Sequence, residues 1–209
     1  MDTSLSIGHY LNELSSNSPT PGGGNVSAFC GTLASSLGIM VCNLTIGKKK
    51  YLDSEEELKR LKEKLERAKD EFLTLSKEDN KAFDQVMEAF KLPKETDVQK
   101  SMRLQKIEKA AIGAGLIPFR VISLCKEIIP ALMIIAEKGN QNSLSDAGVA
   151  LSLISTAAQG AVLNVLINCS SYKNNPQAKE ILSRSESEFR EVKDTCNKGI
   201  EIIERKLGS

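Results

Sequence analysis

The sequence has few aromatic residues and almost no net charge. Aromatic side chains make up 4% of its 209 residues, and 28 lysines and arginines are balanced by 27 aspartates and glutamates. A nucleic-acid-binding protein needs a positive surface for phosphates and aromatic platforms for bases. The composition therefore argues against nucleic acid as a partner.

Cysteine and histidine are too sparse and too scattered for several common kinds of site. The cysteines are dispersed, and no two of them form a CxxC pair. This pattern predicts core thiols in a reducing compartment rather than disulfides or a zinc site. His9 is the only histidine, and no Ser-His-Asp or metal-ligand pattern accompanies it. Any chemistry must therefore depend on carboxylate, lysine and amide groups, and we expect no metal.

The polarity of two segments bears on whether the chain is secreted or crosses a membrane. Residues 1–16 are too polar for the apolar region of a secretion signal. Residues 25–46 carry no charge over a length that can cross a bilayer, but polar side chains interrupt them throughout. A helix enclosed by other helices explains this second segment better. We therefore expect a cytoplasmic protein without a membrane partner.

Apolar residues recur every three or four positions along almost the whole chain, and no convincing strand alternation is present. The sequence therefore predicts an all-α fold, a single-domain bundle of long antiparallel helices over residues 1–209. The first helix is expected to turn Ile7, Leu11 and Leu14 inward. The expected helices cover about residues 4–16, 25–46, 53–90, 96–115, 118–137, 146–169 and 177–207.

The segment SPTPGGGNVSAF, residues 18–29, places three glycines directly before the uncharged helix. A glycine run costs conformational entropy, so it usually persists where a side chain would be in the way. The run is either a flexible connector or a backbone cradle for an anion at a helix start. Small residues follow along one face of the helix, where they allow another backbone of this chain or of a second copy to approach closely. These are Ala28, Gly31, Ser35, Gly38 and Cys42.

Asp79 interrupts an otherwise apolar stripe of the 53–90 helix. A carboxylate in such a stripe loses hydration unless it finds partners, so it has either a structural ion pair or a functional role. Asp146 lies in the first turn of its helix, which the helix dipole favours in any case. Asn164 and Asn168 share one face of an apolar helix, where neighbouring helices or a polar heterocycle can satisfy them. By pattern alone, the chain is a helical bundle with a polar spot inside it.

Five motifs in order give the chain a more specific likeness: PTPGGGNVSA, NLTIGKKKY, KEDNKAFDQVMEAFKLPKET, GNQNSLSDAGVA and GAVLNVLIN. Together they resemble the cyclodeaminase domain of the formiminotransferase–cyclodeaminase family, which also includes stand-alone methenyltetrahydrofolate cyclohydrolases. The resemblance covers nearly the whole chain. It implies an all-helical folate enzyme that is a homodimer or a larger homo-oligomer. It implies a tetrahydrofolate derivative as the substrate, with no cofactor beyond it.

The family's functional positions can be matched residue by residue. The matching residues are Pro21, Gly22, Gly23 and Gly24 in the proline–glycine loop, Lys48 in the GK segment, Asp79 in D-x-x-A-F, Asn140, Ser145 and Asp146 in G-N-x-x-x-x-S-D, and Asn164 and Asn168 in N-x-x-x-N. Asn25 is a departure, because family members often have serine there. The resemblance implies that Asp79 and Asp146 are catalytic and that the other positions bind the substrate.

The resemblance leaves two reactions open. One closes 5-formiminotetrahydrofolate to 5,10-methenyltetrahydrofolate with loss of ammonia, and the other hydrolyses the methenyl compound to 10-formyltetrahydrofolate. Both have a cationic one-carbon unit that a carboxylate can stabilise. We expect Asp79 and Asp146 to approach one cavity and to titrate as a coupled pair. Lys48 or the amides of the glycine loop would face the glutamate tail. The alternative from another class is a non-catalytic helical scaffold that oligomerises.

Overall fold

The structure is a computed structural model that describes residues 6–208. Within this range the chain is helical and contains no strand, which confirms the all-α prediction. Three short 3-10 turns, Lys49–Ser54, Gln141–Ser143 and Ser170–Tyr172, connect longer helices. The α-helices are α1 (Ile7–Leu14), α2 (Gly23–Asn43), α3 (Glu55–Phe90), α4 (Asp97–Lys138), α5 (Leu144–Cys169) and α6 (Pro176–Leu207).

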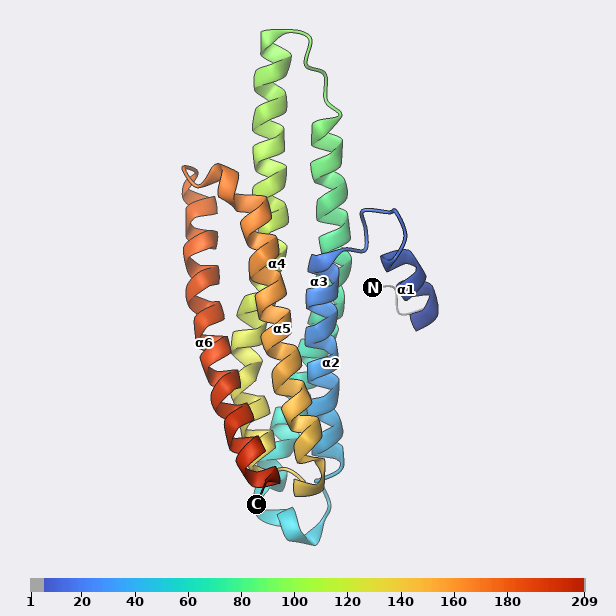
Figure 1. The fold of residues 1–209 in the computed structure, drawn as a ribbon, viewed down its shortest axis with the longest axis vertical. Helices are drawn as coiled ribbons and strands as arrows, with labels where there is room; N and C mark the ends of the chain where they lie inside the picture. Colours follow the sequence, from blue (N-terminus) through green and yellow to red (C-terminus); the bar gives the residue numbers. More distant parts are fainter. Residues whose placement is uncertain (1–5, 209) are drawn as a thin grey trace.

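Helices α2 to α6 lie lengthwise beside one another, and the α3–α4 hairpin projects beyond the others (Figure 1). Helix α2 packs on α3 and α5, α4 packs on α3 and α5, and α6 covers α4 and α5. Short connections make successive helices antiparallel, as predicted for a bundle. One continuous hydrophobic core runs between them, with Phe72, Leu65, Ile122, Leu132 and Ile154 among its members.

Helix α4 contradicts the prediction of two helices over 96–115 and 118–137. It is a single helix of 42 residues with Pro118 and Pro130 inside it. An interior proline removes one backbone hydrogen bond. Apolar side chains on both sides of Pro118, such as Ile112 and Ile122, are buried in the common core. This burial keeps the two halves of α4 in line on either side of Pro118. Local sequence preference alone does not reveal such packing.

The small-residue face of α2 is closed by side chains of the same chain. A Cβ added at Gly31 would lie 2.6 Å from the ring of Phe72, and one at Gly38 would lie 2.6 Å from Leu65 and 2.7 Å from Leu132. Of the two possibilities left by the sequence, the structure therefore selects approach within the chain. The bulky residues on the other side of α2, including Leu33 and Met40, face outward.

Helix α1 faces the bundle with a different side from the one predicted. Ile7 is 64% exposed and Leu11 is 54% exposed, so the expectation that they point inward is wrong, and Leu14 is only half-buried. Tyr10 is the buried residue instead. Its ring meets that of Phe29 edge to face, with centroids 5.5 Å apart, and its hydroxyl donates to Asn25 Oδ1 at 2.9 Å. A polar anchor therefore decided the orientation of this short helix.

The cysteines are free thiols, and Cys42, Cys125, Cys169 and Cys196 are buried, as the sequence predicted. Burial raises the pKa of the Cys42 thiol to about 11, so it stays protonated at neutral pH. Two helical segments, Gly23–Asn43 and Gln141–Tyr172, are long and apolar enough to cross a membrane by length and composition. Both contribute to the core of the bundle, where other helices cover their inner faces.

Candidate functional site

A pocket of about 260 Å³ lies at the start of α2, where α2 meets α3 and α5. We call it the Asp79 pocket, because Asp79 is the only charged residue among those that line it. The other lining residues are glycines, amides and apolar side chains: Pro19, Thr20, Gly22, Gly23, Gly24, Phe83, Val86, Ala114, Asn164, Ile167 and Asn168. Pro21 does not line the pocket, although its neighbour Thr20 does, and the Thr20–Pro21 peptide is cis.

The carboxylate of Asp79 reaches from α3 to the N-terminus of α2. Gly22 caps that helix without any side-chain hydrogen bond. Burial raises the pKa of Asp79 above its usual range, and the hydrogen bond from the backbone N–H of Asn25 offsets part of that rise. The dipole and free N–H groups of a helix start favour an anion at this place. Here the anion is the protein's own carboxylate, held by a neighbouring helix.

The close contact at Gly24 explains why α2 begins with glycines. A Cβ at Gly24 would overlap the Asp79 carboxylate, with the carboxyl carbon only 2.6 Å away. At Gly23, by contrast, a Cβ would make only ordinary contact with Asn164 Nδ2, at 3.4 Å. The glycine run is therefore no mere connector, because Gly24 lets a carboxylate lie against the helix backbone.

Asn25 is a part of the site that the sequence reasoning overlooked, apart from its departure from the family pattern. Its side chain is fully buried and donates to Ser76 O at 2.7 Å and to Asn80 Oδ1 at 3.2 Å. It also accepts the Tyr10 hydroxyl. This network fixes the first turn of α2 against α3 beside Asp79. The available signal was a large polar side chain, an asparagine, in the first turn of a helix of mostly small and apolar residues.

Asn164 and Asn168 lie together on the wall of the pocket, as predicted from their spacing on one helix face. Asn164 Nδ2 donates to Gly160 O at 2.8 Å, and Asn168 Nδ2 donates to Asn164 O at 2.9 Å. Both amide nitrogens are thus engaged by the backbone of α5. Their side-chain carbonyl oxygens remain as hydrogen-bond acceptors at the pocket.

The expectation that Asp79 and Asp146 share a cavity is wrong for a single chain. Asp146 and Asn164 are 18 residues apart on α5, which corresponds to about 27 Å along a helix. Because α5 runs antiparallel to α2, its later part meets Gly23 while Asp146 lies at the opposite end of the bundle. The prediction that the two carboxylates titrate as a coupled pair is therefore also wrong for a single chain.

Four of the predicted site residues gather at that opposite end, near the C-terminus of α2. Asn140 has a structural role there, since its N–H donates to Thr45 Oγ1 at 2.8 Å and its side-chain amide donates to Leu44 O at 3.2 Å. Lys48 and Ser145 are exposed and Asp146 is half-buried. Within residues 6–208, neither Lys48 nor Asp146 forms an ion pair.

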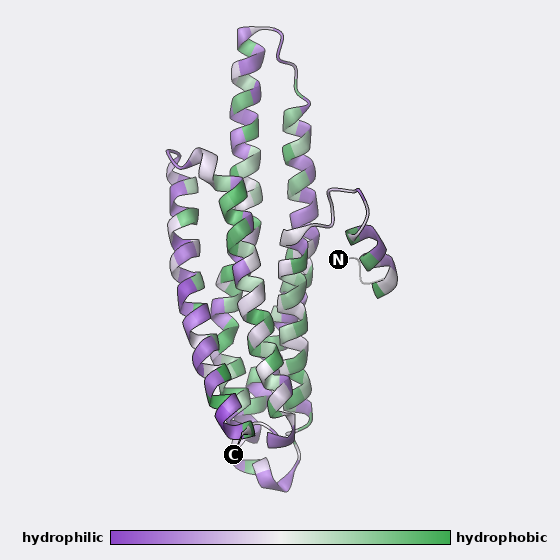
Figure 2. Cartoon of the chain, viewed as in Figure 1, coloured by the Kyte–Doolittle hydropathy of each residue, from purple (hydrophilic) through white to green (hydrophobic). Residues whose placement is uncertain are grey.

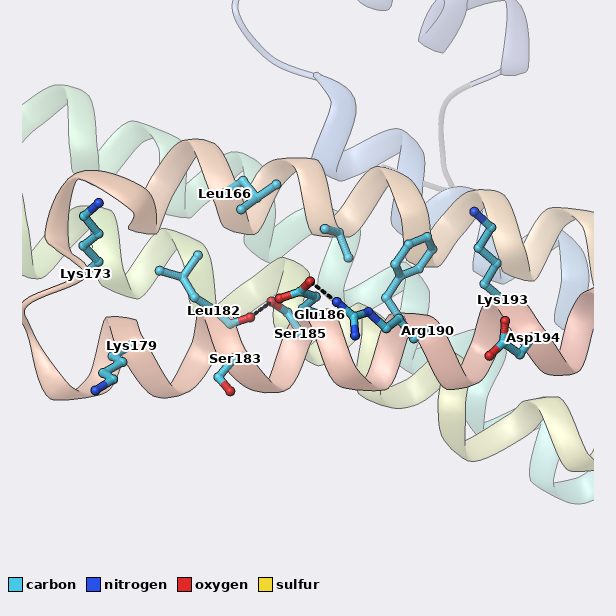
Figure 3. Close-up of a pocket in the computed structure, with 12 residues that line it drawn as sticks. Leu166, Lys173, Lys179, Leu182, Ser183, Ser185, Glu186, Arg190, Lys193 and Asp194 are labelled. Atoms are coloured by element: carbon cyan, nitrogen blue, oxygen red, sulfur yellow. Dashed lines mark hydrogen bonds and ion pairs between the residues drawn. The ribbon is translucent and has the colours of Figure 1, made fainter.

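A larger groove of about 880 Å³ lies between α5 and α6 (Figure 3). Leu166 and Leu182 border it together with charged side chains, and Arg190 pairs with Glu186. None of the candidate catalytic or substrate-binding residues lines this groove. The part of the chain that the structure describes contains no cluster of three histidine, cysteine or acidic side chains suited to a metal ion. The Asp79 pocket is therefore the better candidate, and its chemistry is that of a carboxylate and amides.

The chain is similar to known proteins along nearly its whole length. The family model described as formiminotransferase-cyclodeaminase matches residues 6–187. A methenyltetrahydrofolate cyclohydrolase of Methylorubrum extorquens is 39% identical over 198 residues, which are 95% of each chain. The crystal structure of a formiminotetrahydrofolate cyclodeaminase from Thermotoga maritima superposes with a TM-score of 0.87 at 30% identity, covering 97% of this chain and 98% of that one.

A longer relative matches over a part of its length. The formimidoyltransferase-cyclodeaminase of Mus musculus is 32% identical over 168 residues, which are 80% of this chain and 31% of that protein. The chain thus spans about a third of the length of this longer relative.

Proposed function

The chain belongs to the formiminotransferase–cyclodeaminase family, and we propose that it hydrolyses 5,10-methenyltetrahydrofolate to 10-formyltetrahydrofolate in the Asp79 pocket. It is an enzyme of folate one-carbon chemistry, acting on the carbon that bridges N5 and N10. The likeness to a methenyltetrahydrofolate cyclohydrolase along 95% of both chains favours hydrolysis. The observation in the structure that carries the proposal is a half-buried carboxylate with a raised pKa in an otherwise uncharged pocket.

The carboxylate suits both stages of the hydrolysis. The methenyl substrate carries a positive charge spread over N5, the bridging carbon and N10. Ionised Asp79 stabilises that cation at close range, in a pocket that contains no other charged side chain. It then accepts a proton from the water that attacks the bridging carbon. The bond between N5 and that carbon breaks, N5 keeps the electron pair and takes up a proton, and the formyl group stays on N10. One proton is released overall.

The raised pKa of Asp79 strengthens this role. Because burial destabilises its charged form, the carboxylate holds a proton more tightly than an exposed aspartate and is a better base. A bound cation opposes the effect of burial and keeps the carboxylate ionised until water attacks. The helix N-terminus that faces Asp79 adds a fixed positive dipole, which keeps the negative charge in position.

The remaining walls fit a pterin ring. The carbonyl oxygens of Asn164 and Asn168 are acceptors for the ring's N–H groups, and the bond from each amide nitrogen to the backbone of α5 fixes the orientation of the amide. Phe83, Val86 and Ile167 supply apolar contact for its faces. Gly22 and Gly23 let the ligand come close to the backbone, as the sequence suggested. We expect no direct contact between Pro21 and the substrate, because Pro21 does not line the pocket.

The test measures the fall in methenyltetrahydrofolate absorbance catalysed by the purified chain. Asp79→Asn keeps the size of the side chain but removes the charge and the proton acceptor, so turnover should fall about 100-fold or more. Asp84→Asn is the matched control, since Asp84 is an exposed acid on the same helix and does not line the pocket. Equal activity of wild type and Asp79→Asn would remove Asp79 from the mechanism.

Cyclodeamination is the second candidate reaction, favoured by the close structural match to the Thermotoga maritima cyclodeaminase. In that reaction N10 attacks the formimino carbon of the amidinium form, the N10 proton moves to the departing nitrogen, and ammonia leaves. Asp79 can relay this proton. Methenyl absorbance would then rise from 5-formiminotetrahydrofolate with an equal release of ammonia, whereas a hydrolase would only consume the methenyl compound.

Several wider properties belong to the same proposal. We expect a cytoplasmic homodimer that needs no cofactor beyond its tetrahydrofolate substrate and binds neither nucleic acid nor membrane. A non-catalytic scaffold is the competing view. It predicts that a folate derivative changes neither the fluorescence nor the melting temperature of the chain.

A further inference from the structure

Helix α1 stands at the side of the bundle (Figure 1) and is held there through one buried side chain. Figure 2 shows hydrophobic as well as hydrophilic stretches on this helix. Ile7 and Leu11 are mostly exposed, however, and Tyr10 is the only buried residue of α1. The ring of Tyr10 meets that of Phe29 edge to face, and its hydroxyl donates to Asn25 Oδ1 at 2.9 Å. The burial of apolar side chains alone therefore does not explain where α1 is held.

Asn25, which accepts the Tyr10 hydroxyl, holds Asp79 in two ways. Its backbone N–H donates to the Asp79 carboxylate. Its side-chain amide donates to Ser76 O at 2.7 Å and to Asn80 Oδ1 at 3.2 Å. Ser76 lies three residues before Asp79 and Asn80 directly follows it, so both belong to the turn of α3 that carries the carboxylate. Asn25 thus fixes the carboxylate and the backbone that bears it at the same time.

The orientation of the Asn25 amide depends on the Tyr10 hydroxyl. The side chain of Asn25 is fully buried, its nitrogen donates twice to α3, and its oxygen accepts from Tyr10. Because Ser76 O can only accept, the amide nitrogen must face α3 and the amide oxygen must face α1. Without the hydroxyl, Asn25 Oδ1 would lose the hydrogen bond that it accepts in the described chain. A buried acceptor in that state costs free energy until the side chain turns or water enters. Either change would loosen the turn of α2 that meets Asp79.

The same hydrogen bond closes the segment between α1 and α2, residues 15–22, into a loop. Pro19 and Thr20 of this segment line the Asp79 pocket. Because Tyr10 precedes the segment and Asn25 follows it, their bond ties both ends together beside the pocket. A tie at the base of a loop reduces the conformational freedom of the residues between. Two roles for the Tyr10 hydroxyl are therefore distinct: it holds Asp79 through Asn25, or it only holds this wall of the pocket.

We propose that Tyr10 is a positioning residue for Asp79, because its hydroxyl, acting through Asn25, holds the carboxylate where it accepts the proton of the attacking water. This inference rests on the proposed folate chemistry. Tyr10 does not line the pocket, so its effect reaches the substrate only through other residues. Of the two roles, the first is the better supported, since Asn25 contacts both the carboxylate and the turn of α3 that carries it. Helix α1 is then a part of the catalytic unit, although its residues lie outside the continuous core of the bundle.

The first test is the kinetics of Tyr10→Phe, which keeps the ring and removes only the hydroxyl. A shift of about 1 Å at a catalytic group can cost about 100-fold in rate, and the loss of one tie should allow a smaller shift, so kcat for methenyltetrahydrofolate should fall about 10-fold. KM should change less than kcat, because Asp79 accepts the proton in the transition state. Tyr172→Phe is the matched control, since Tyr172 is a partly buried tyrosine that does not line the pocket, and its kinetics should match wild type. A raised KM with wild-type kcat in Tyr10→Phe would overturn the proposal, because the hydroxyl would then hold only the pocket wall.

The decisive test asks whether Tyr10→Phe still slows a chain in which its target is already changed. If Tyr10 acts through Asp79, the double variant Tyr10→Phe/Asp79→Asn should be no slower than Asp79→Asn, because the proton acceptor is already gone. Tyr10→Phe/Asn25→Ala should likewise match Asn25→Ala, with thermal melts confirming that each variant is folded.

A further fall of about 10-fold in both double variants would mean that the two changes act independently and would overturn the proposal. Wild-type kcat and KM in Tyr10→Phe would overturn it too. Full activity of Asp79→Asn, or a wild-type chain inactive toward both folates, would instead contradict the proposed function.

Discussion

Gly24 offers the sharpest single change, because it is the point where Asp79 meets the backbone of α2. In Gly24→Ala the new Cβ would lie 2.6 Å from the Asp79 carboxyl carbon, whereas ordinary contact begins at 3.4 Å. The carboxylate must therefore move by at least about 0.8 Å, because its Oδ1 lies closer still to the new Cβ. A displacement of about 1 Å at a catalytic group can cost about 100-fold in rate. We expect kcat/KM for methenyltetrahydrofolate to fall by that order.

The stability of Gly24→Ala should change far less than its activity. Loss of the hydrogen bond from the Asn25 N–H resembles loss of a helix cap and costs about 0.5–2 kcal/mol. Alanine in place of glycine inside a helix returns up to about 1 kcal/mol. The net effect is within about 1 kcal/mol, a shift in Tm of about 2–4 °C for a chain of this size.

Gly113→Ala is the matched control for this experiment. It adds the same methyl group to an exposed helical glycine of α4, where nothing lies within 4 Å and which does not line the Asp79 pocket. Its Tm should hold or rise slightly, and its activity should stay within a few-fold of wild type. Steady-state kinetics and thermal unfolding of both variants check this pair. Equal activity of Gly24→Ala and wild type would refute the view that Gly24 exists to admit Asp79.

Two further substitutions test the surroundings of Asp79 and the packing of α2. The pKa of Asp79 is raised in the folded chain, so its ionisation opposes folding at neutral pH. Asp79→Asn should therefore melt at or above the wild-type Tm at pH 7, with a gap that narrows as the pH falls toward about 4 in a series of thermal melts. Gly38→Leu would push into Leu65 and Leu132 and should lower the free energy of unfolding by about 1–3 kcal/mol in urea titrations.

Periodicity alone was enough to predict the helical fold and the inward position of Asp79, because a 3-4 stripe directs every member toward the same neighbours. The pairing of Asn164 with Asn168 followed from the same rule. The continuity of α4 through Pro118 did not, since it depends on burial against other helices. Nor did the contact between Gly24 and Asp79, which joins helices far apart in the sequence.

The separation of Asp146 from Asp79 is a different case, since the sequence already contained the evidence. Asp146 and Asn164 were both assigned to one helix, and 18 residues of helix extend about 27 Å. A single cavity could not hold both in one chain. The expectation of one shared cavity came from the motif positions alone and ignored the length of the helix that joins them.

The most direct measurement is a crystal structure of the chain with a bound methenyltetrahydrofolate analogue. The bridging carbon should lie within reach of the Asp79 carboxylate, between the glycine loop and Asn164. A folate bound instead in the groove between α5 and α6, far from Asp79, would contradict it.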